Sequence, residues 1–264
     1  MRIARLRRGL SRPTSPTSPT DLSDFYQLTD THAERYDKAP YLGGRLTGER
    51  SSWNESELMA PVMPSKVVCI GRNYAAHAKE LGHEVPKEPL LFLKAPSAII
   101  GPNESIVLPR ESARVEHEAE LGVVIGARAK DVPADRAHLY IFGYTCVGDI
   151  TARDLQKSDG QWSRAKGFDT FCPVGPWVET SLDPADVRVS CSVNDAVRQD
   201  GRTSMMMFNV PTLIAYISRM MTLEPGDLVV TGTPEGVGPL VNGDKLAIDV
   251  EGVGSLRVSV TGRG

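Results

Sequence analysis

The sequence lacks the features that define several large classes of protein. Only 6% of its 264 residues are aromatic, and 30 Lys and Arg residues are nearly balanced by 33 Asp and Glu residues. This balance provides no strongly basic surface, so we expect no nucleic-acid partner. No apolar run approaches the ~18 residues of a membrane span, so we expect no membrane association either.

Cysteine is scarce, and the signatures of common enzyme classes are missing. The four cysteines lie far apart inside apolar runs: Cys69, Cys146, Cys172 and Cys191. We therefore expect buried free thiols in a protein of the reducing cytoplasm. No GxGxxG follows a predicted strand, and no GxxxxGK[ST] or GxSxG is present. Dinucleotide-binding, P-loop and serine-hydrolase assignments therefore have no support.

The N-terminal part of the chain differs in composition from the rest. Its first twelve residues hold five arginines and no acid, and residues 11–20 read SRPTSPTSPT. This composition matches a transit peptide. We favour the alternative, a short strand over residues 1–6 followed by a flexible Pro/Ser/Thr insertion. Residues 1–62 are expected to form a small variable region, and residues 63–264 the main domain.

Short β-branched segments dominate the main domain. Strands are predicted at residues 66–70, 115–125, 141–149, 187–193, 228–231, 245–250 and 254–260. Helices are predicted at 73–81, with Asn73 as N-cap, and at 133–140. A third helix begins near Pro211 and places Leu213, Ile217 and Met220 on one face. This pattern indicates an α+β fold that is predominantly β, with a rolled or barrel-like sheet and few helices.

Three carboxylates alternate along one predicted strand, VEHEAEL at residues 115–121. Glu116, Glu118 and Glu120 would share a face with roughly 7 Å between neighbours, and they repel one another unless a positive charge intervenes. A solvated strand edge is the alternative, but the strand continues into an apolar run that must be buried. A divalent cation would neutralise the row, and oxygen ligands favour Mg²⁺, Mn²⁺ or Ca²⁺ over zinc.

Other polar residues are candidates for the same site. His77 and Glu80 are i and i+3 on one helical face, where the carboxylate would raise the basicity of the imidazole; a surface ion pair is the alternative. Asp149 ends an apolar strand, where a carboxylate is costly unless something binds it. Gln156 and Lys166 follow, and both could equally be surface residues.

A Gly-rich segment, TGTPEGVGP at residues 231–239, follows an apolar strand. Its backbone N–H groups could bind a carboxylate, although a tight turn explains the glycines equally well.

Six segments follow one another along the chain in this order: GRNYAAHAKE, FLKAPSA, EHEAELGVVIG, GYTCVGDITARDLQ, AKGFDTFCPVGPW and TGTPEGVGP. Together they resemble the fumarylacetoacetate hydrolase family from about residue 60 to residue 264.

The resemblance implies roles for individual residues. The metal ligands of the family fall on Glu118, Glu120 and Asp149, and its water-activating pair falls on His77 and Glu80. The metal would be Mg²⁺ or Mn²⁺, with Ca²⁺ as a further candidate. Because the helix that holds the pair is short, we expect it to be a mobile lid.

The remaining matches concern catalysis and substrate binding. The catalytic lysine of the family falls on Lys166, and Gln156 matches a position that helps to hold water or substrate. Thr233 matches a contact to a substrate carboxylate, and Lys94 lies in a family motif and is a second candidate for substrate binding.

The family also implies a mixed β-roll core, a homodimer and an enzyme acting on small 2-oxo or β-diketo acids. Its chemistry passes through an enolate stabilised by the metal. We expect C–C hydrolysis of an acylpyruvate-type substrate. The alternatives are 2-hydroxyhepta-2,4-diene-1,7-dioate isomerase or oxaloacetate decarboxylase activity, or a non-catalytic metal-binding protein. The presence of a base beside the carboxylate cluster argues against the last.

Overall fold

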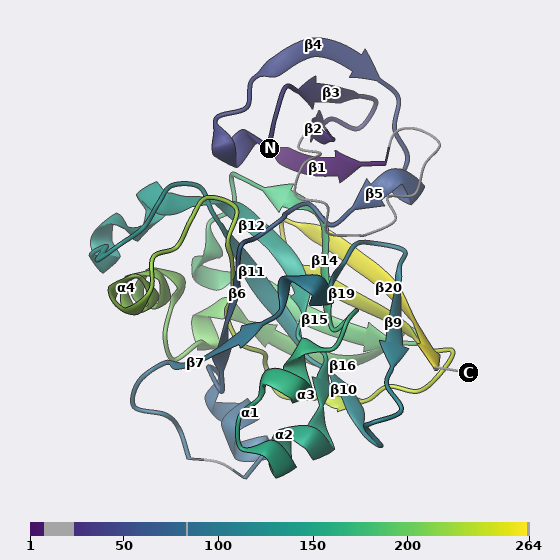
Figure 1. Cartoon of the computed structure of the whole chain (residues 1–264), viewed down its shortest axis with the longest axis vertical. Coiled ribbons are helices and arrows are strands. Elements are labelled where there is room, and N and C mark those ends of the chain that lie inside the picture. Colours follow the sequence, from purple (N-terminus) through teal and green to yellow (C-terminus); the bar gives the residue numbers. More distant parts are fainter. Residues whose placement is uncertain (8–23, 83, 263–264) are drawn as a thin grey trace.

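The computed structural model describes residues 1–7, 24–82 and 84–262 (Figure 1). A large mixed sheet forms its centre, as expected for a predominantly β fold. Its main path is β4 (Leu46–Ser51), β3 (Ala33–Tyr36), β2 (Phe25–Leu28), β1 (Arg2–Leu6), β14 (Cys172–Glu179), β12 (Ile141–Gly148), β11 (Ala119–Ile125), β17 (Leu228–Val230), β6 (Val67–Gly71) and β7 (Leu90–Lys94). Beside this path, β5 (Leu58–Met59) pairs with β1, and β8 (Ile99–Ile100) runs parallel to β14.

Two smaller sheets complete the fold. The five-stranded sheet runs in the order β16 (Ala196–Arg202), β15 (Arg188–Val193), β19 (Lys245–Val250), β20 (Gly254–Gly262) and β9 (Ser105–Leu108). The three-stranded sheet contains β13 (Thr151–Ala152), β10 (Val115–His117) and β18 (Gly238–Pro239). Parallel pairs such as β17 with β6 occur among antiparallel ones, so the sheets are mixed.

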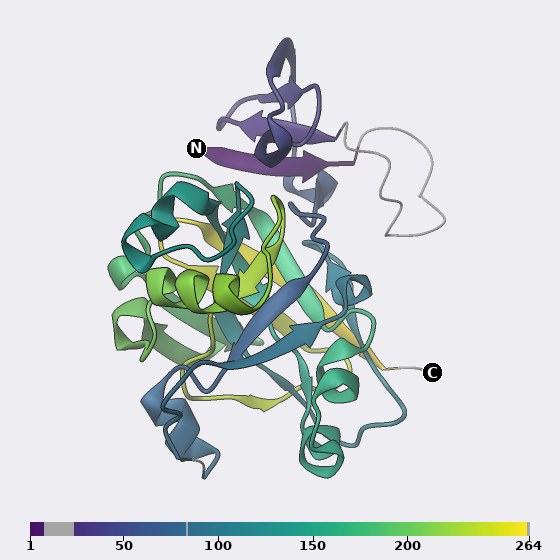
Figure 2. The same cartoon turned by 60° about the vertical axis from the view of Figure 1, so that its left-hand side comes forward.

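The helices are short and lie mostly at one end. They are α1 (Ala75–Glu80), α2 (Arg153–Asp159), α3 (Ser163–Gly167) and α4 (Val210–Met220). In both views α1, α2 and α3 lie at the end opposite β1–β5 (Figures 1 and 2). The 3-10 helices are η1 (Pro40–Leu42), η2 (Glu55–Glu57), η3 (Pro96–Ala98), η4 (Ala134–Tyr140), η5 (Pro184–Asp186) and η6 (Thr203–Met205), and the helix predicted at 133–140 is η4. Among the described residues, no helix is both long and apolar enough to cross a membrane.

Strand β11 is buried on both faces, and this fixes the region around it. Leu121 and Val123 belong to the largest apolar core, which also contains Ile248 of the five-stranded sheet. Val124 points the other way, into a second core that also contains Leu228 of β17. Side chains that alternate between two packed cores leave a strand no room to shift, because a one-residue slip would exchange the two faces.

Several features that the sequence predicts are confirmed. Most of the predicted strands form, including the N-terminal one as β1, and all four cysteines are buried and free. Burial raises the pKa of the thiols of Cys172 and Cys191 to about 12, which makes them unreactive. The Pro/Ser/Thr insertion at 11–20 lies outside the described residues. The domain boundary at residue 62 stays a prediction. Strand β1 pairs with β14, so the N-terminal region shares the central sheet with the main domain.

Three local predictions are wrong. Residues 115–125 form two strands in different sheets, with a break at Glu118, rather than one. Met220 is 52% exposed, while Ile214 takes its place on the buried face of α4. Strands β2 to β4 form where only polar, turn-rich chain was expected. Buried Phe25, Leu28 and Tyr36 hold β2 and β3 against the core, whereas β4 has no buried residue and forms by pairing with β3.

Candidate metal centre and catalytic cavity

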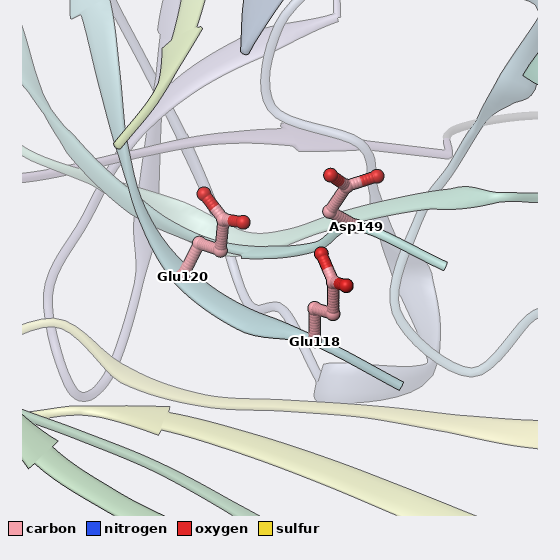
Figure 3. Close-up of side chains that lie close together, drawn as sticks. All are labelled: Glu118, Glu120 and Asp149. Atoms are coloured by element: carbon pink, nitrogen blue, oxygen red, sulfur yellow. The ribbon is translucent and has the colours of Figure 1, made fainter. Parts of the chain in front are cut away.

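Three buried carboxylates meet where β11 begins and β12 ends (Figure 3). Antiparallel pairing sets Ala119 opposite Gly148, and the N–H of Asp149 donates to the carbonyl of Glu118 at 2.9 Å. Glu120 follows two positions after Glu118 and so shares its face. One oxygen from each carboxylate lies within 4.8 Å of the other two. A single cation with bonds of ~2.0–2.6 Å to oxygen can therefore reach all three.

Basic side chains already balance two of these carboxylates. Lys166 Nζ lies 2.8 Å from Glu118 Oε2 and 2.6 Å from Asp149 Oδ2. Lys94 Nζ contacts Asp149 Oδ1 at 2.8 Å, and Arg153 Nη2 contacts Glu118 Oε1 at 2.6 Å. Burial acts to raise the pKa of Glu118, but Lys166 and Arg153 outweigh it and hold this pKa well below the usual range. Glu118 is therefore held in its anionic form, and Asp149 is paired with two lysines.

Glu120 is the exception within the cluster. It accepts a hydrogen bond from the backbone N–H of Gly232, but among the described residues no lysine or arginine is paired with it. Burial, with the nearby charges of Asp149 and Glu118, raises the pKa of Glu120 well above its usual range. A buried carboxylate in this position must take up a proton or a cation. The donor set, three carboxylates without cysteine, fits Mg²⁺, Mn²⁺ or Ca²⁺.

Glu116 does not join the cluster, contrary to the prediction that three alternating carboxylates share one face. It lies on β10, before the break at Glu118, and β10 pairs in the three-stranded sheet. Its carboxylate accepts from Arg114 Nε at 2.6 Å and from Arg153 Nε at 2.7 Å. Two guanidinium groups therefore neutralise Glu116, and Asp149 supplies the third acid of the cluster.

His77 and Glu80 form a hydrogen-bonded pair on α1. His77 Nδ1 lies 3.2 Å from Glu80 Oε2, and the other oxygen of Glu80 accepts from the N–H of Gly236 at 3.0 Å. His77 is buried, whereas the side chain of Glu80 is 32% exposed. If Nδ1–H donates to Glu80, the Nε2 nitrogen keeps the lone pair that a general base needs.

The predicted N-cap of this helix has another function. The buried Asn73 donates from Nδ2 to the carbonyls of Phe208 and Thr231 at 2.9 and 2.8 Å. Its Oδ1 accepts from the N–H of Phe208 at 2.9 Å. Tyr74 therefore takes the N-cap position of α1, and Asn73 instead connects the base of the helix to two segments distant in sequence.

One cavity of about 720 Å³ brings most of the candidate residues together. Its wall includes His77, Glu80, Glu118, Glu120, Asp149, Gln156, Lys166 and Thr233. Lys94 does not line it and instead holds Asp149 and the carbonyl of Ile150. The hydroxyl of Thr233 donates to the carbonyl of Ala119 at 2.8 Å and accepts from Gln199 Nε2 at 2.7 Å.

Sequence analysis did not identify Arg153, which connects the acids to α2. It contacts Glu116 and Glu118, and its Nη1 donates to Gln156 Oε1 at 2.6 Å. The i, i+3 spacing of Arg153 and Gln156 on a helix, four residues after Asp149, was a usable signal. An arginine on a short helix is usually a surface residue, so this spacing does not by itself identify a site.

Residues 66–261 match the family described as "Fumarylacetoacetate (FAA) hydrolase C-terminal". The chain belongs to the fumarylacetoacetate hydrolase family. An uncharacterised protein of Pyrococcus abyssi is 57% identical over 205 residues, which cover 75% of this chain and 91% of that protein. The mitochondrial oxaloacetate tautomerase of Bos taurus is 44% identical over 216 residues, or 77% of this chain and 69% of that protein.

A solved structure supports the same assignment over the whole chain. The crystal structure of 5-carboxymethyl-2-hydroxymuconate delta-isomerase from Mycobacterium smegmatis is 43% identical and has a TM-score of 0.86, with full coverage of both chains. The mixed β-roll is therefore the fold of this protein. Its relatives include enzymes named as hydrolases, isomerases and tautomerases.

Proposed function

We propose that this protein is a divalent-metal-dependent enzyme that acts on small 2-oxo or β-diketo acids by way of an enolate. The observation that supports this most is the environment of Glu120. Its carboxylate is buried beside two other acids and is paired with no cation in the described chain, while the neighbouring acids are paired with Lys166, Lys94 and Arg153. A further positive charge therefore has a place at Glu120.

Each residue of the cavity has a role under this proposal. Glu118, Glu120 and Asp149 would hold Mg²⁺ or Mn²⁺. When bound, the cation would supply Lewis-acid stabilisation of the enolate that forms next to the 2-oxo group. Lys166 is buried and keeps its charge, because Asp149 and Glu118 raise its pKa against the effect of burial. It is placed to stabilise negative charge that develops on a substrate.

The first candidate reaction is C–C hydrolysis of an acylpyruvate-type substrate. It is favoured by the hydrogen bond between His77 and Glu80, which orients the imidazole in the same cavity as the carboxylates. His77 would take a proton from a water molecule, which then attacks the distal carbonyl, while Gln156 holds water or substrate. Glu80 would stabilise the resulting imidazolium.

The second candidate is isomerisation or keto–enol exchange of a 2-oxo acid, including relatives of 2-hydroxyhepta-2,4-diene-1,7-dioate. It is favoured by the activities named for the Mycobacterium smegmatis and Bos taurus proteins. Here His77 would move a proton between positions of the enolate, and no water would attack. Oxaloacetate decarboxylation uses the same enolate and needs no base.

A substrate panel tests both candidates. The protein is incubated with Mg²⁺ or Mn²⁺ and with acetylpyruvate, fumarylpyruvate, oxaloacetate or 2-hydroxyhepta-2,4-diene-1,7-dioate, and products are identified by NMR. Pyruvate with a free carboxylic acid identifies hydrolysis, and a shifted double bond or an altered keto–enol ratio identifies isomerisation. The absence of turnover with all four, in a protein that binds the metal, would instead support a non-catalytic metal-binding protein.

The homodimer and the cytoplasmic location stay predictions. Sedimentation of the purified protein measures the first, since one chain has a mass of 28.7 kDa. A single species near this mass would contradict the dimer.

A further inference from the structure

Arg72 differs from the other arginines of the cavity wall. Arg114 and Arg153 are paired with Glu116, whereas the described residues offer Arg72 no acidic partner. Its side chain is half-buried, and burial alone lowers its pKa. Lys157 also lines the cavity without an acidic partner, but it is exposed to solvent. Arg72 is thus a partly desolvated cation that faces a cavity without a counter-ion.

The backbone holds Arg72 in an uncommon conformation. Its φ is 58°, in the left-handed region that favours glycine. The residue before it, Gly71, is the last residue of β6 and pairs with Leu90. The residue after it is Asn73, which is fixed by its hydrogen bonds to Phe208 and Thr231. A strained residue held between two fixed neighbours is typical of a functional position and sets the direction of its side chain in advance.

An aromatic wall connects Arg72 to the acidic cluster. The guanidinium carbon lies 5.9 Å from the ring centre of Trp162, and the rings of Trp162 and Phe92 are 5.1 Å apart. Lys166 Nζ lies 5.0 Å from the ring centre of Phe92 and also contacts Glu118 and Asp149. Both rings line the cavity. The wall therefore presents an apolar surface with a cation at each end.

We propose that Arg72 is a specificity-determining residue that binds the second carboxylate of a dicarboxylic 2-oxo acid. This inference rests on the proposed function, in which the 2-oxo acid end of the substrate lies at Glu118, Glu120 and Asp149. The carbon chain of the substrate would lie along Phe92 and Trp162, and its far carboxylate would accept two hydrogen bonds from the planar guanidinium. A 2-oxo acid that ends in a methyl group would leave Arg72 without a partner.

The test compares two six-carbon 2-oxo acids that differ only at the far end, which is a carboxylate in one and a methyl group in the other. Calorimetry measures the binding of 2-oxoadipate and of 2-oxohexanoate to the Mg²⁺-loaded protein. We expect 2-oxoadipate to bind roughly 10- to 100-fold more tightly, which is the contribution of a charge-assisted pair of hydrogen bonds. Arg72→Met should remove this difference and change 2-oxohexanoate binding by less than about twofold. Arg72→Lys, which keeps the charge but loses the fork of donors, should keep part of the difference.

Lys157→Met is the matched control, because it removes an exposed cation from the same wall. It should retain the preference for 2-oxoadipate. Equal losses in Arg72→Met for the two ligands, or a preference lost in Lys157→Met but kept in Arg72→Met, would overturn the role of Arg72. In those cases both ligands still bind the metal-loaded protein, and the proposed function stands. If neither ligand binds the wild-type protein, both the proposed function and the subsite are wrong.

Discussion

The two halves of the candidate site are held in different ways. Glu118, Glu120 and Asp149 adjoin strands that are paired on both sides and packed between two cores. His77 and Glu80 lie on a helix of six residues, the end of which is tied to the rest of the molecule by the bond from Gly236 to Glu80. The acids are therefore fixed by the sheet, while the base depends on a few hydrogen bonds.

This difference fits two separate roles, a rigid cation site on the strands and a movable base on α1. A cation site needs ligands held to within a few tenths of an ångström, which paired strands provide. A base that acts on a substrate must allow the substrate to enter and must then exclude water, which a short segment of low local stability permits. We therefore expect α1 to act as a lid and the acidic cluster to stay fixed.

The largest expected effect concerns the base. His77→Ala should lower acylpyruvate hydrolysis by roughly 10²–10⁴-fold, because general-base assistance is lost. Oxaloacetate decarboxylation by the same variant should be partly spared, since it requires no attacking water. The measurement is kcat/KM for both substrates on one preparation, so that losses of folded protein cancel. An equal loss for both substrates at unchanged metal affinity would mean that His77 only closes the site.

Lys166 should matter for every substrate. Lys166→Ala is expected to lower all activities by roughly 10²–10³-fold, the usual cost of removing a group that stabilises a developing anion. Mg²⁺ affinity should not fall, because the ammonium competes for oxygens of Glu118 and Asp149. Activity and metal binding are measured on the same sample. A loss of activity that tracks a loss of metal would assign Lys166 to the metal site instead.

Asn73 tests the attachment of α1. Asn73→Ala should lower the free energy of unfolding by about 1–3 kcal/mol, because it leaves a buried carbonyl of Thr231 and partly buried backbone groups of Phe208 without their side-chain partner. It should also speed hydrogen exchange across residues 75–80. Asn209→Ala is the comparison, since Asn209 caps α4 and its loss costs about 1 kcal/mol. If Asn209→Ala also speeds the hydrogen exchange of α1, the hydrogen bonds of Asn73 are not what attaches this helix.

The smallest expected effect is a change in the hydrogen exchange of α1 when ligand binds. With Mg²⁺ and oxalate, hydrogen exchange of residues 75–80 should slow, while that of β11 and β12 stays unchanged. The physical reason is that β11 and β12 are already hydrogen-bonded and buried, whereas the proposed lid would gain order when ligand fills the cavity. Protection of α1 that is already high and does not change with ligand would contradict the lid.

Two side-chain proximities, Glu118 with Glu120 and His77 with Glu80, could be predicted from the sequence because they are local. Glu118 and Glu120 are two residues apart where β11 begins, and His77 and Glu80 are three apart on a helix, so short-range spacing indicates that each pair shares a face. The exclusion of Glu116 could not be predicted in this way. It depends on the break at Glu118 and on Arg153, which comes from another segment.

The errors in the fold have the same origin. Asn73 is a residue type typical of N-caps, but its partners are backbone groups of Phe208 and Thr231, 135 and 158 residues away. Strand β4 has no buried residue, so no apolar pattern marks it, and it forms by pairing with β3. The proposed role of Arg72 likewise depends on its contact with Trp162, which is 90 residues away in the sequence and lies near it only in the folded chain.

The central claim is that Glu118, Glu120 and Asp149 hold one divalent cation. Its most direct test is the binding of Mn²⁺, measured by electron paramagnetic resonance, in the wild type, Glu120→Gln and Glu116→Gln. The two variants make the same chemical change on acids four residues apart, but Glu116 is paired with Arg114 and Arg153. We predict one Mn²⁺ per chain in the wild type and in Glu116→Gln, and at least ~10²-fold weaker binding in Glu120→Gln, more than the loss of an outer-sphere partner. Undiminished binding in Glu120→Gln, or an equal loss in both variants, would contradict the account.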